Sequence, residues 1–481
     1  MPNILATLML VIWPMVTAAF YMRLPVQQAV VWSVLSAYLL LPMTEINLPL
    51  LPGLSKYMIP AFFGYSFACM AQGRIISVIP RSRLARICLA MIYVGILGTT
   101  LTNSDPVFIG PRGFLPGLRL YDALSMTIHS LGWLLIWALA REFLNDREGL
   151  ALFARSLAFA MLIYSLPMLY EIRMSPQLHT MIYGFFQHSF AQMMRQGGFR
   201  PIVFLEHGLW VAMITAMAAM AALVLARAAP AGQKSRWYRI AGFLTVMVVL
   251  CKSMAALLYV LLLGPIILFA PARLMLRVAV ILAAIVLAFP VLRGTGLIPI
   301  EAMVDFAAGY SEDRAQSLAF RFYHEDAFLA RVAERPVFGW GSWGRNAIYD
   351  PITGESLSVS DGQWIISMSV FGYVGFFGFF GLMLAPILIM GQAFRRAGRE
   401  ISVLAAGMAL MLMANLVDLL PNATLTQVSW LLTGGLLGYV ERLQPEAART
   451  RPETVLIPEM TRSGGFAGLV GPAPLGPRSL L

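Results

Sequence analysis

The chain has 481 residues, of which 59% are hydrophobic and only 12% charged, and its mean hydropathy is +0.74. Soluble domains carry about 25% charged residues, so this composition excludes a disordered chain, a coiled coil and a disulfide scaffold, and argues against a soluble enzyme. The net charge of +11 is typical of the basic cytoplasmic loops of a multi-pass membrane protein, and we expect no nucleic-acid partner.

Apolar runs along the chain predict an all-α polytopic integral membrane protein with about 12–14 transmembrane helices. The first run follows Met1-Pro2-Asn3, which has no basic residue, so it predicts a membrane span rather than a cleaved signal peptide. The thirteen candidate runs are 4–22, 26–42, 57–72, 84–102, 123–140, 151–170, 203–226, 238–251, 254–270, 275–292, 364–391, 401–420 and 424–440.

The distribution of Lys and Arg predicts the orientation of these spans. Alternate loops, beginning with the one at Arg23, hold more Lys and Arg than the others, which predicts that they are cytoplasmic. The two longest loops, about 171–202 and 293–363, are then external, and a loop as long as the second usually has a function. The predicted units are a membrane domain of ten spans at 1–292, a large periplasmic loop at 293–363, three further spans at 364–440 and a disordered cytoplasmic tail at 441–481.

The large loop contains an amphipathic helical pattern at 314–335. At 100° per residue, four arginines and His324 share an arc of roughly 100° on one face. Such a face fits an interfacial helix whose arginines meet lipid headgroups, and it also fits an anion site facing a cavity. The four arginines are Arg314, Arg321, Arg331 and Arg335.

The other external loop places Arg195 and Arg200 shortly before Glu206 and His207, where an apolar run begins. Ionisable groups at the start of a membrane helix are costly, so they indicate a functional site. The alternative is that Glu206 only pairs with Arg200 at the membrane interface.

A second basic residue, Lys252, interrupts an apolar stretch on the same side, where it is either functional or a lysine that reaches to the headgroups. His179 and His188 are expected to be solvated loop residues. The chain has no nucleotide-binding loop, no His-Glu-x-x-His and no Gly-x-Ser-x-Gly, and its three cysteines lie in or beside apolar runs. These features predict chemistry without a metal or another cofactor.

Several of these segments, in this order, resemble the O-antigen ligase/polymerase superfamily over about 195–440. The segment from Arg321 to Gly341, with Pro336-x-x-Gly339-x-Gly341, resembles the family's large periplasmic loop, an arginine-bearing helix that runs into a glycine turn. The segments that resemble its other elements are Gly198-Phe-Arg200 with Glu206-His207, Cys251-Lys252-Ser253, Ser360-Asp361-Gly362, and Gly372-Tyr-Val-Gly375.

The resemblance implies a lipid-linked-sugar glycosyltransferase fold in the bacterial inner membrane, with its active face periplasmic. The implied activity is metal-independent, inverting transfer from an undecaprenyl-diphosphate-linked oligosaccharide, and other polysaccharide assembly proteins are expected partners. Asp361 stands where ligases of the family commonly have a His-Asn motif, which favours a polymerase of an exopolysaccharide or O-antigen. An O-antigen ligase is the first alternative, and a lipid-linked oligosaccharide transporter is the alternative from another class.

Transfer from a lipid diphosphate needs positive charge on the leaving group and a base for the attacking hydroxyl. Arginine suits phosphate because its planar fork donates two parallel hydrogen bonds. The candidates for binding the diphosphate are Arg200, Arg321, Lys252, Arg195 and Arg314. The candidate bases are Glu206, Asp361, His207 and His324.

Overall fold

A computed structural model describes residues 1–48, 51–195, 197–309, 311–397 and 402–449 of the chain. Thirteen of its helices coincide with the thirteen apolar runs. These are α1 (Ile4–Arg23), α2 (Val26–Leu40), α3 (Met58–Gln72), α4 (Arg83–Thr102), α5 (Leu120–Phe143), α6 (Arg147–Met174), α8 (Gly208–Ala228), α9 (Ala231–Leu250), α10 (Met254–Phe269), α11 (Ala272–Gly294), α14 (Gln363–Ala397), α15 (Val403–Asp418) and α16 (Gln427–Arg449).

The remaining elements lie in the connections. The helices are α7 (Leu178–Tyr183), α12 (Ile300–Ala308) and α13 (Glu312–Glu334), with 3-10 turns η1 (Gly110–Arg112) and η2 (Phe190–Met193). Three antiparallel hairpins pair β1 (Glu45–Leu48) with β2 (Leu51–Ser55), β3 (Val107–Phe108) with β4 (Phe114–Leu115), and β5 (Met194–Arg195) with β6 (Gly198–Phe199).

The prediction of an all-α multi-pass membrane protein is confirmed. Within the described residues, seven helices are long and apolar enough to cross a membrane, namely α1, α4, α5, α6, α8, α11 and α14. Three more apolar helices, α2, α10 and α15, have 15 or 16 residues. The exact number of spans and the periplasmic position of 293–363 stay predictions.

Local sequence signals set where several helices begin. The side chains of Asn3, Ser82 and Asp146 accept hydrogen bonds from backbone N–H groups in the first turns of α1, α4 and α6. Pro25 and Pro230 directly precede α2 and α9, where a missing N–H costs nothing. The last helix extends nine residues past the predicted end of its span, to Arg449, and the rest of the predicted tail lies outside the described residues.

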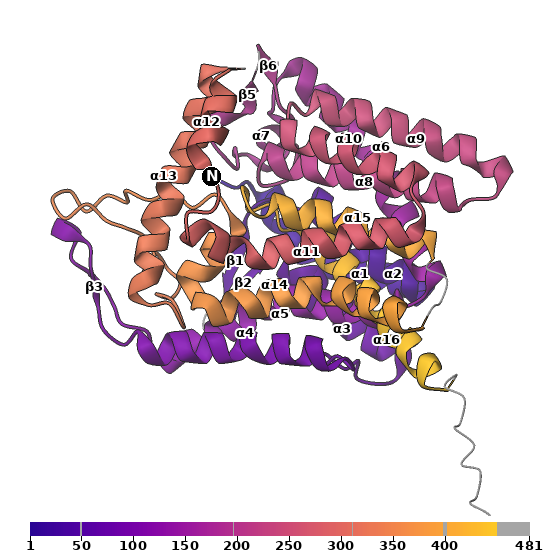
Figure 1. Cartoon of the computed structure of the whole chain (residues 1–481), viewed down its shortest axis with the longest axis horizontal. Helices are drawn as coiled ribbons and strands as arrows, with labels where there is room; N and C mark the ends of the chain where they lie inside the picture. The colour runs from indigo at the N-terminus through magenta and orange to yellow at the C-terminus, as the bar shows by residue number, and fades with distance from the viewer. Residues whose placement is uncertain (49–50, 196, 310, 398–401, 450–481) are drawn as a thin grey trace, which may run out of the picture.

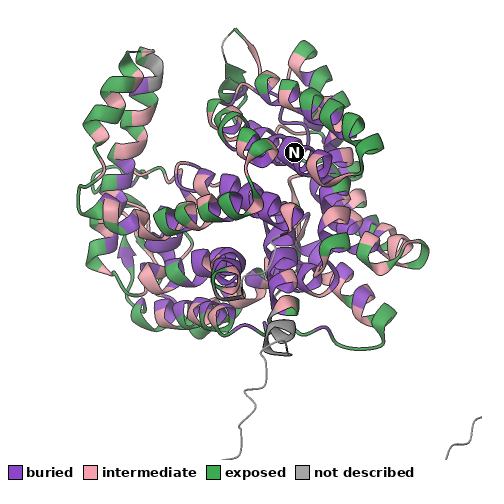
Figure 2. Ribbon diagram, turned by 45° about the vertical axis from the view of Figure 1, so that its right-hand side comes forward, coloured by how far each residue is buried: buried purple, intermediate pink, exposed green. Residues whose placement is uncertain are grey.

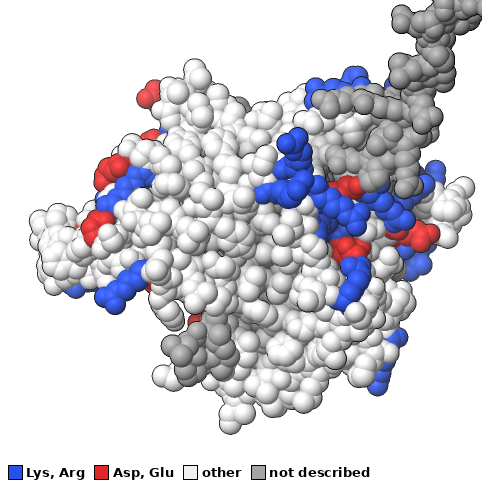
Figure 3. All heavy atoms as spheres, turned by 90° about the horizontal axis from the view of Figure 1, so that it is seen from below, with Lys and Arg blue, Asp and Glu red and all other residues white. Residues whose placement is uncertain are grey.

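The helices pack side by side around α8 and α15, which are buried over most of their length (Figures 1 and 2). The helix pairs α4 and α14, α5 and α16, and α8 and α9 pack closely. The segments α12, α13 and β3–β4 lie at the opposite end of the molecule from the end of α16 (Figure 1). Figure 3 shows charged residues at the two ends and a broad uncharged band between them, as expected for a protein that crosses a membrane.

A kink in α14 receives the glycine turn that follows α13. Gly372 has φ 65° and ψ −166°, so the helix is interrupted there. Next to the kink, the N–H of Tyr373 donates to the carbonyl of Pro336 at 2.8 Å. A Cβ on Gly339 would lie 2.6 Å from the backbone nitrogen of Gly372, so the two backbones approach as closely as only glycine permits. The turn therefore sets where α13 lies relative to α14.

Candidate functional site

The segment 200–207, which carries three of the predicted site residues, is held by a buried carboxylate near the end of α6. One oxygen of Glu171 accepts the backbone N–H groups of Ile202 and Val203, both at 2.8 Å, and the other accepts that of Leu178 at 3.0 Å. Val203 has φ 50°, which is strained for a β-branched residue. The hydrogen bonds to Glu171 hold this conformation and so fix the segment before α8.

Arg200 joins this segment to the turn between α9 and α10. Its side chain is buried, and it donates to the carbonyls of Lys252 at 2.9 Å and Cys251 at 3.3 Å. Burial lowers the pKa of Arg200 to about 10, and the charges of Arg195 and Arg321 act in the same direction. It is still protonated at neutral pH. The ion pairs found among the described residues do not include Arg200, so its positive charge is available to a ligand.

Lys252 lies beside this arginine in a left-handed conformation, with φ 52°. Its Nζ donates to the carbonyl of Arg195 at 2.8 Å, and it passes so close to Gly198 that a side chain there would collide with it. The two predicted diphosphate ligands Lys252 and Arg195 therefore flank Arg200, one on the α9–α10 turn and the other on the β5–β6 hairpin.

Arg321 reaches the same region from α13. Its Nε lies 3.3 Å from a carboxylate oxygen of Asp361, just before α14, and its Nη1 lies 3.5 Å from the carbonyl of Pro421. The side chains of Arg321 and Asp361 are 31% and 39% exposed, so both are open to a ligand. One turn further along α13, Glu325 and Asp326 form ion pairs with Arg293 of α11, at 3.3 Å and 2.8 Å. These ion pairs anchor the helix that carries Arg321.

The predicted base Glu206 faces a buried lysine that sequence reasoning did not single out. Lys56, between β2 and α3, is 1% exposed, and its Nζ donates to the carbonyl of Phe204 at 2.7 Å. Burial raises the pKa of Glu206, and the positive charge of Lys56 partly offsets this by lowering it. The pKa of Lys56 is itself lowered by burial. The alternative in which Glu206 pairs with Arg200 is wrong, since the ion pairs among the described residues do not join the two.

His207 is the N-cap residue of α8. Its Nδ1 accepts the backbone N–H of Leu209 at 3.0 Å, so its Nε2 carries the proton and donates to Gln192 at 3.2 Å. Burial lowers the pKa of His207 to about 3, with further lowering by His188 and by Arg200. Both ring nitrogens are thus engaged, and the ring stays neutral.

The other two predicted residues lie on α13. His324 is buried, with its ring 4.2 Å from that of Phe320, and its Nδ1 has no hydrogen-bond partner among the described residues. Arg314 is in the first turn of α13, but its side chain lies outside the described part of the structure.

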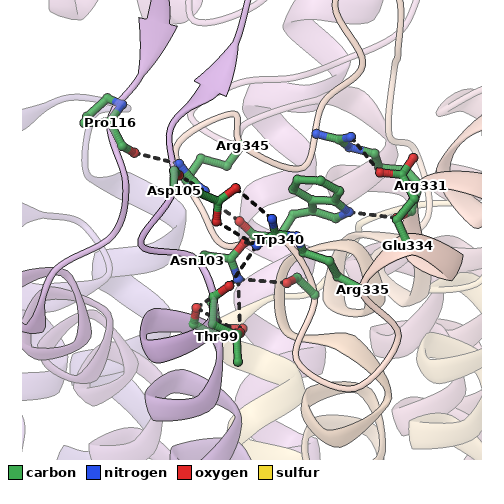
Figure 4. Close-up of polar contacts among 11 residues, drawn as sticks. Thr99, Asn103, Asp105, Pro116, Arg331, Glu334, Arg335, Trp340 and Arg345 are labelled. Atoms are coloured by element: carbon green, nitrogen blue, oxygen red, sulfur yellow. Dashed lines mark hydrogen bonds and ion pairs between the residues drawn. The ribbon is translucent and has the colours of Figure 1, made fainter.

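Two of the four arginines predicted on the basic face of the 314–335 helix, Arg331 and Arg335, contact Trp340 in a separate cluster (Figure 4). We call Arg331, Arg335 and Arg345 with this indole the Trp340 cluster. The guanidinium carbons of Arg331 and Arg335 lie 3.3 and 4.2 Å from the ring centroid. Arg335 also pairs with Asp105 at 2.7 Å.

The third arginine of the Trp340 cluster, Arg345, is 1% exposed. It donates to the carbonyls of Trp340 at 3.2 Å, Pro116 at 2.6 Å and Asp105 at 2.9 Å (Figure 4). Each of its three nitrogens donates to the protein's own backbone, so this arginine joins the large loop to the segment after α4 rather than binding an anion.

Other residues were misjudged or missed. His179, expected to be solvated, is fully buried. Its ring accepts the N–H of Met43 at 3.2 Å and contacts the carbonyl of Phe185 at 2.7 Å. Burial lowers its pKa to about 4. Lys56 and Glu171 were missed. Each of the two is a single charged residue at the edge of an apolar run, which is the feature that singled out Lys252.

Two cavities adjoin the region. The first, of about 460 Å³, lies between α4, α5 and α14, and is lined mainly by apolar residues, with Gln363 two positions after Asp361. The second, of about 470 Å³, lies between the β1–β2 hairpin, α5 and α16, and Lys56 lines it. His129 and Trp133 line both cavities.

We call Arg200, Glu206, Lys252, Arg321 and Asp361 the Arg200–Arg321 site. Three loops distant in sequence supply these residues, and charge from Arg321 affects both Arg200 and His207. No protein-family model matches the chain, and no curated protein sequence matches it. Within the described ranges, no three His, Cys, Asp or Glu side chains come together in a way that could hold a metal ion.

Proposed function

We propose that this protein is a membrane glycosyltransferase of the O-antigen ligase/polymerase type, which polymerises undecaprenyl-diphosphate-linked repeat units at the periplasmic face of the inner membrane. The observation that carries the proposal is a pair of arginines from distant loops, Arg200 and Arg321, of which the second is close enough for its charge to lower the pKa of the first. Arg200 is buried and has no ion pair among the described residues, and the side chain of Arg321 is about one-third exposed. A diphosphate is the ligand that such a pair fits best, because guanidinium forks bind its oxygens with charge-assisted hydrogen bonds.

The arginines act on the leaving group. As the bond between the anomeric carbon and the diphosphate oxygen breaks, the electron pair goes to that oxygen, and Arg200 and Arg321 stabilise its negative charge. Lys252 and Arg195 add positive charge beside them. Asp361 orients Arg321 through their ion pair and leaves the remaining donors of its guanidinium for phosphate.

Among the four candidate bases, Glu206 fits best. The acceptor hydroxyl attacks the anomeric carbon and passes its proton to the carboxylate, which gives inversion at that carbon. Burial raises the pKa of Glu206, and a carboxylate with a raised pKa is a stronger base. Asp361 is engaged by Arg321, and neither ring nitrogen of His207 is free.

The direct test is a reaction with the purified protein in detergent and a lipid-linked repeat unit. Polymerisation should give a ladder of products that differ by one repeat. Flipping of the intact lipid in vesicles without a new glycosidic bond would instead identify a transporter.

A strain that lacks the gene separates polymerase from ligase. Loss of a polymerase should leave single repeat units on the carrier or on the final acceptor. Long chains left on the polyprenyl carrier would contradict polymerisation and identify a ligase.

A further inference from the structure

The second cavity contains polar groups that the proposed transfer has not yet used. It is bounded by the β1–β2 hairpin, α5, α16 and the segment that precedes α16, and its volume is about 470 Å³. Glu45, Lys56, His129 and Gln427 are among its lining residues. Ligand sites in proteins are usually apolar pockets with a few convergent polar groups, which is the composition found here.

Gln427 is the clearest sign that this cavity takes a ligand. The residue is 3% exposed, and its Nε2 donates to the carbonyl of Tyr57 at 2.9 Å. Its Oε1 is buried and has no hydrogen-bond partner among the described residues. A buried carbonyl oxygen without a donor is costly, so a donor on a bound molecule would relieve that cost.

Aromatic rings form the apolar wall of the same cavity. Trp133 and Trp430 stack on each other with their centroids 4.3 Å apart and an interplanar angle of 19°. Their stacking holds both indoles in place and presents a rigid, flat surface to the cavity. A pyranose ring is complementary to such a surface, because its C–H face packs on an indole while its hydroxyls need donors and acceptors at the edge.

The position of Lys56 connects the cavity to the proposed chemistry. Lys56 lines the cavity, and its charge acts on Glu206. A sugar in the cavity would therefore lie next to Lys56, the residue whose charge acts on the proposed base. The first cavity has no Asp, Glu, Lys or Arg among its described lining residues, and Ile92, Ile96 and Phe379 form part of its wall, so it suits a hydrocarbon chain better than a sugar.

We propose that the second cavity binds the saccharide portion of the lipid-linked substrate, with Trp133 as the stacking surface and Gln427 and Lys56 as hydrogen-bond partners of its hydroxyls. This inference rests on the proposed function and adds to it the place where sugar, rather than diphosphate, is recognised.

The test compares two lipids on protein in nanodiscs: undecaprenyl diphosphate, and the undecaprenyl-diphosphate-linked saccharide that accumulates in a strain lacking the gene. Gln427→Leu, which keeps the side-chain size, and Trp133→Leu should each weaken binding of the saccharide lipid about tenfold, as expected for one lost hydrogen bond or ring contact. Gln427 lines the second cavity and not the first, so binding of undecaprenyl diphosphate to Gln427→Leu should stay within about twofold. Trp237→Leu, a buried tryptophan of α9 that packs on Phe159, is the matched control and should change neither affinity.

Equal weakening of both lipids in Gln427→Leu would overturn the inference and assign the second cavity to the polyprenyl chain. Unchanged affinities in Gln427→Leu would also overturn it, and this variant carries the test if Trp133→Leu does not fold. Arg321→Ala separates the two ideas, because it should weaken both lipids whatever the second cavity does. A wild-type protein that binds neither lipid would overturn the proposed function together with the inference.

Discussion

The Trp340 cluster and the Arg200–Arg321 site are both rich in arginine, and both involve the long loop between α11 and α14, yet they use the charge differently. In the cluster, Arg345 donates to three carbonyls and Arg335 pairs with Asp105. In the Arg200–Arg321 site, Arg200 donates hydrogen bonds to two carbonyls and forms no ion pair with a carboxylate among the described residues. Arg321 forms one ion pair, at 3.3 Å. An arginine such as Arg345, whose three nitrogens all donate to the protein's own carbonyls, stabilises the fold, whereas one with a nitrogen to spare can bind an anion.

The largest effect should follow from Glu206→Gln, which removes the proposed base and keeps the size of the side chain. We expect the rate of polymer formation to fall by about 10² to 10⁴. In the wild type, activity should be lost as the pH falls through the pKa of Glu206, and because burial raises that pKa, the loss should begin at a higher pH than for a solvated carboxylate. The measurement is the initial rate of ladder formation against pH.

Lys56→Met gives the matching control for this pH dependence. The charge of Lys56 lowers the pKa of Glu206, so its removal should move the acid limb to higher pH. An unshifted limb in Lys56→Met, or near-normal rates in Glu206→Gln, would remove Glu206 from the mechanism.

Arg321→Ala should reduce polymer formation by about 10²–10³, since it removes charge stabilisation of the leaving group. Arg321→Lys should recover only part of the rate, because a point charge cannot donate two parallel hydrogen bonds. Protein abundance in the membrane and the unfolding temperature in detergent should stay close to those of the wild type. Normal polymer from Arg321→Ala would assign this arginine to the fold, and the contrast with the Trp340 cluster would disappear.

Arg345→Met should have the reverse phenotype. Three backbone carbonyls would lose the donor that buried Arg345 supplies, and we expect a loss of stability on the order of 3 kcal/mol. The unfolding temperature in detergent should fall by several degrees, while the rate per folded molecule changes little. A variant of normal stability that makes no polymer would place Arg345 in the substrate site instead.

The smallest effect on the protein should come from two cysteine substitutions that test the orientation shared by both regions. Ile352 is 81% exposed in the large loop, and a Cβ on Gly232, at the start of α9, meets nothing within 4 Å. A membrane-impermeant thiol reagent added from outside should label Ile352→Cys and not Gly232→Cys, above the background of the native cysteines. The opposite pattern would reverse the orientation, and the proposed periplasmic chemistry would be wrong.

The sequence by itself determined the helices. Each of the thirteen apolar runs became a helix, because a chain in lipid must satisfy its backbone hydrogen bonds internally. The sequence also pointed to the glycines at 339 and 372, and the structure gives the reason, which is the close approach of a turn to a kinked helix. The number of spans and the side of the membrane on which the loops lie stay predictions.

Tertiary structure decided which charges are free. Helical periodicity placed Arg321, Arg331 and Arg335 on one face, but it contains no information about partners from other segments. Asp105 lies 230 positions before Arg335 in the chain, and only folding brings the two together. The same holds for Lys56, which follows the β1–β2 hairpin near the start of the chain and whose charge acts on Glu206. Whether an arginine binds an anion or stabilises a loop depends on which acceptors surround it, and non-local packing supplies those acceptors.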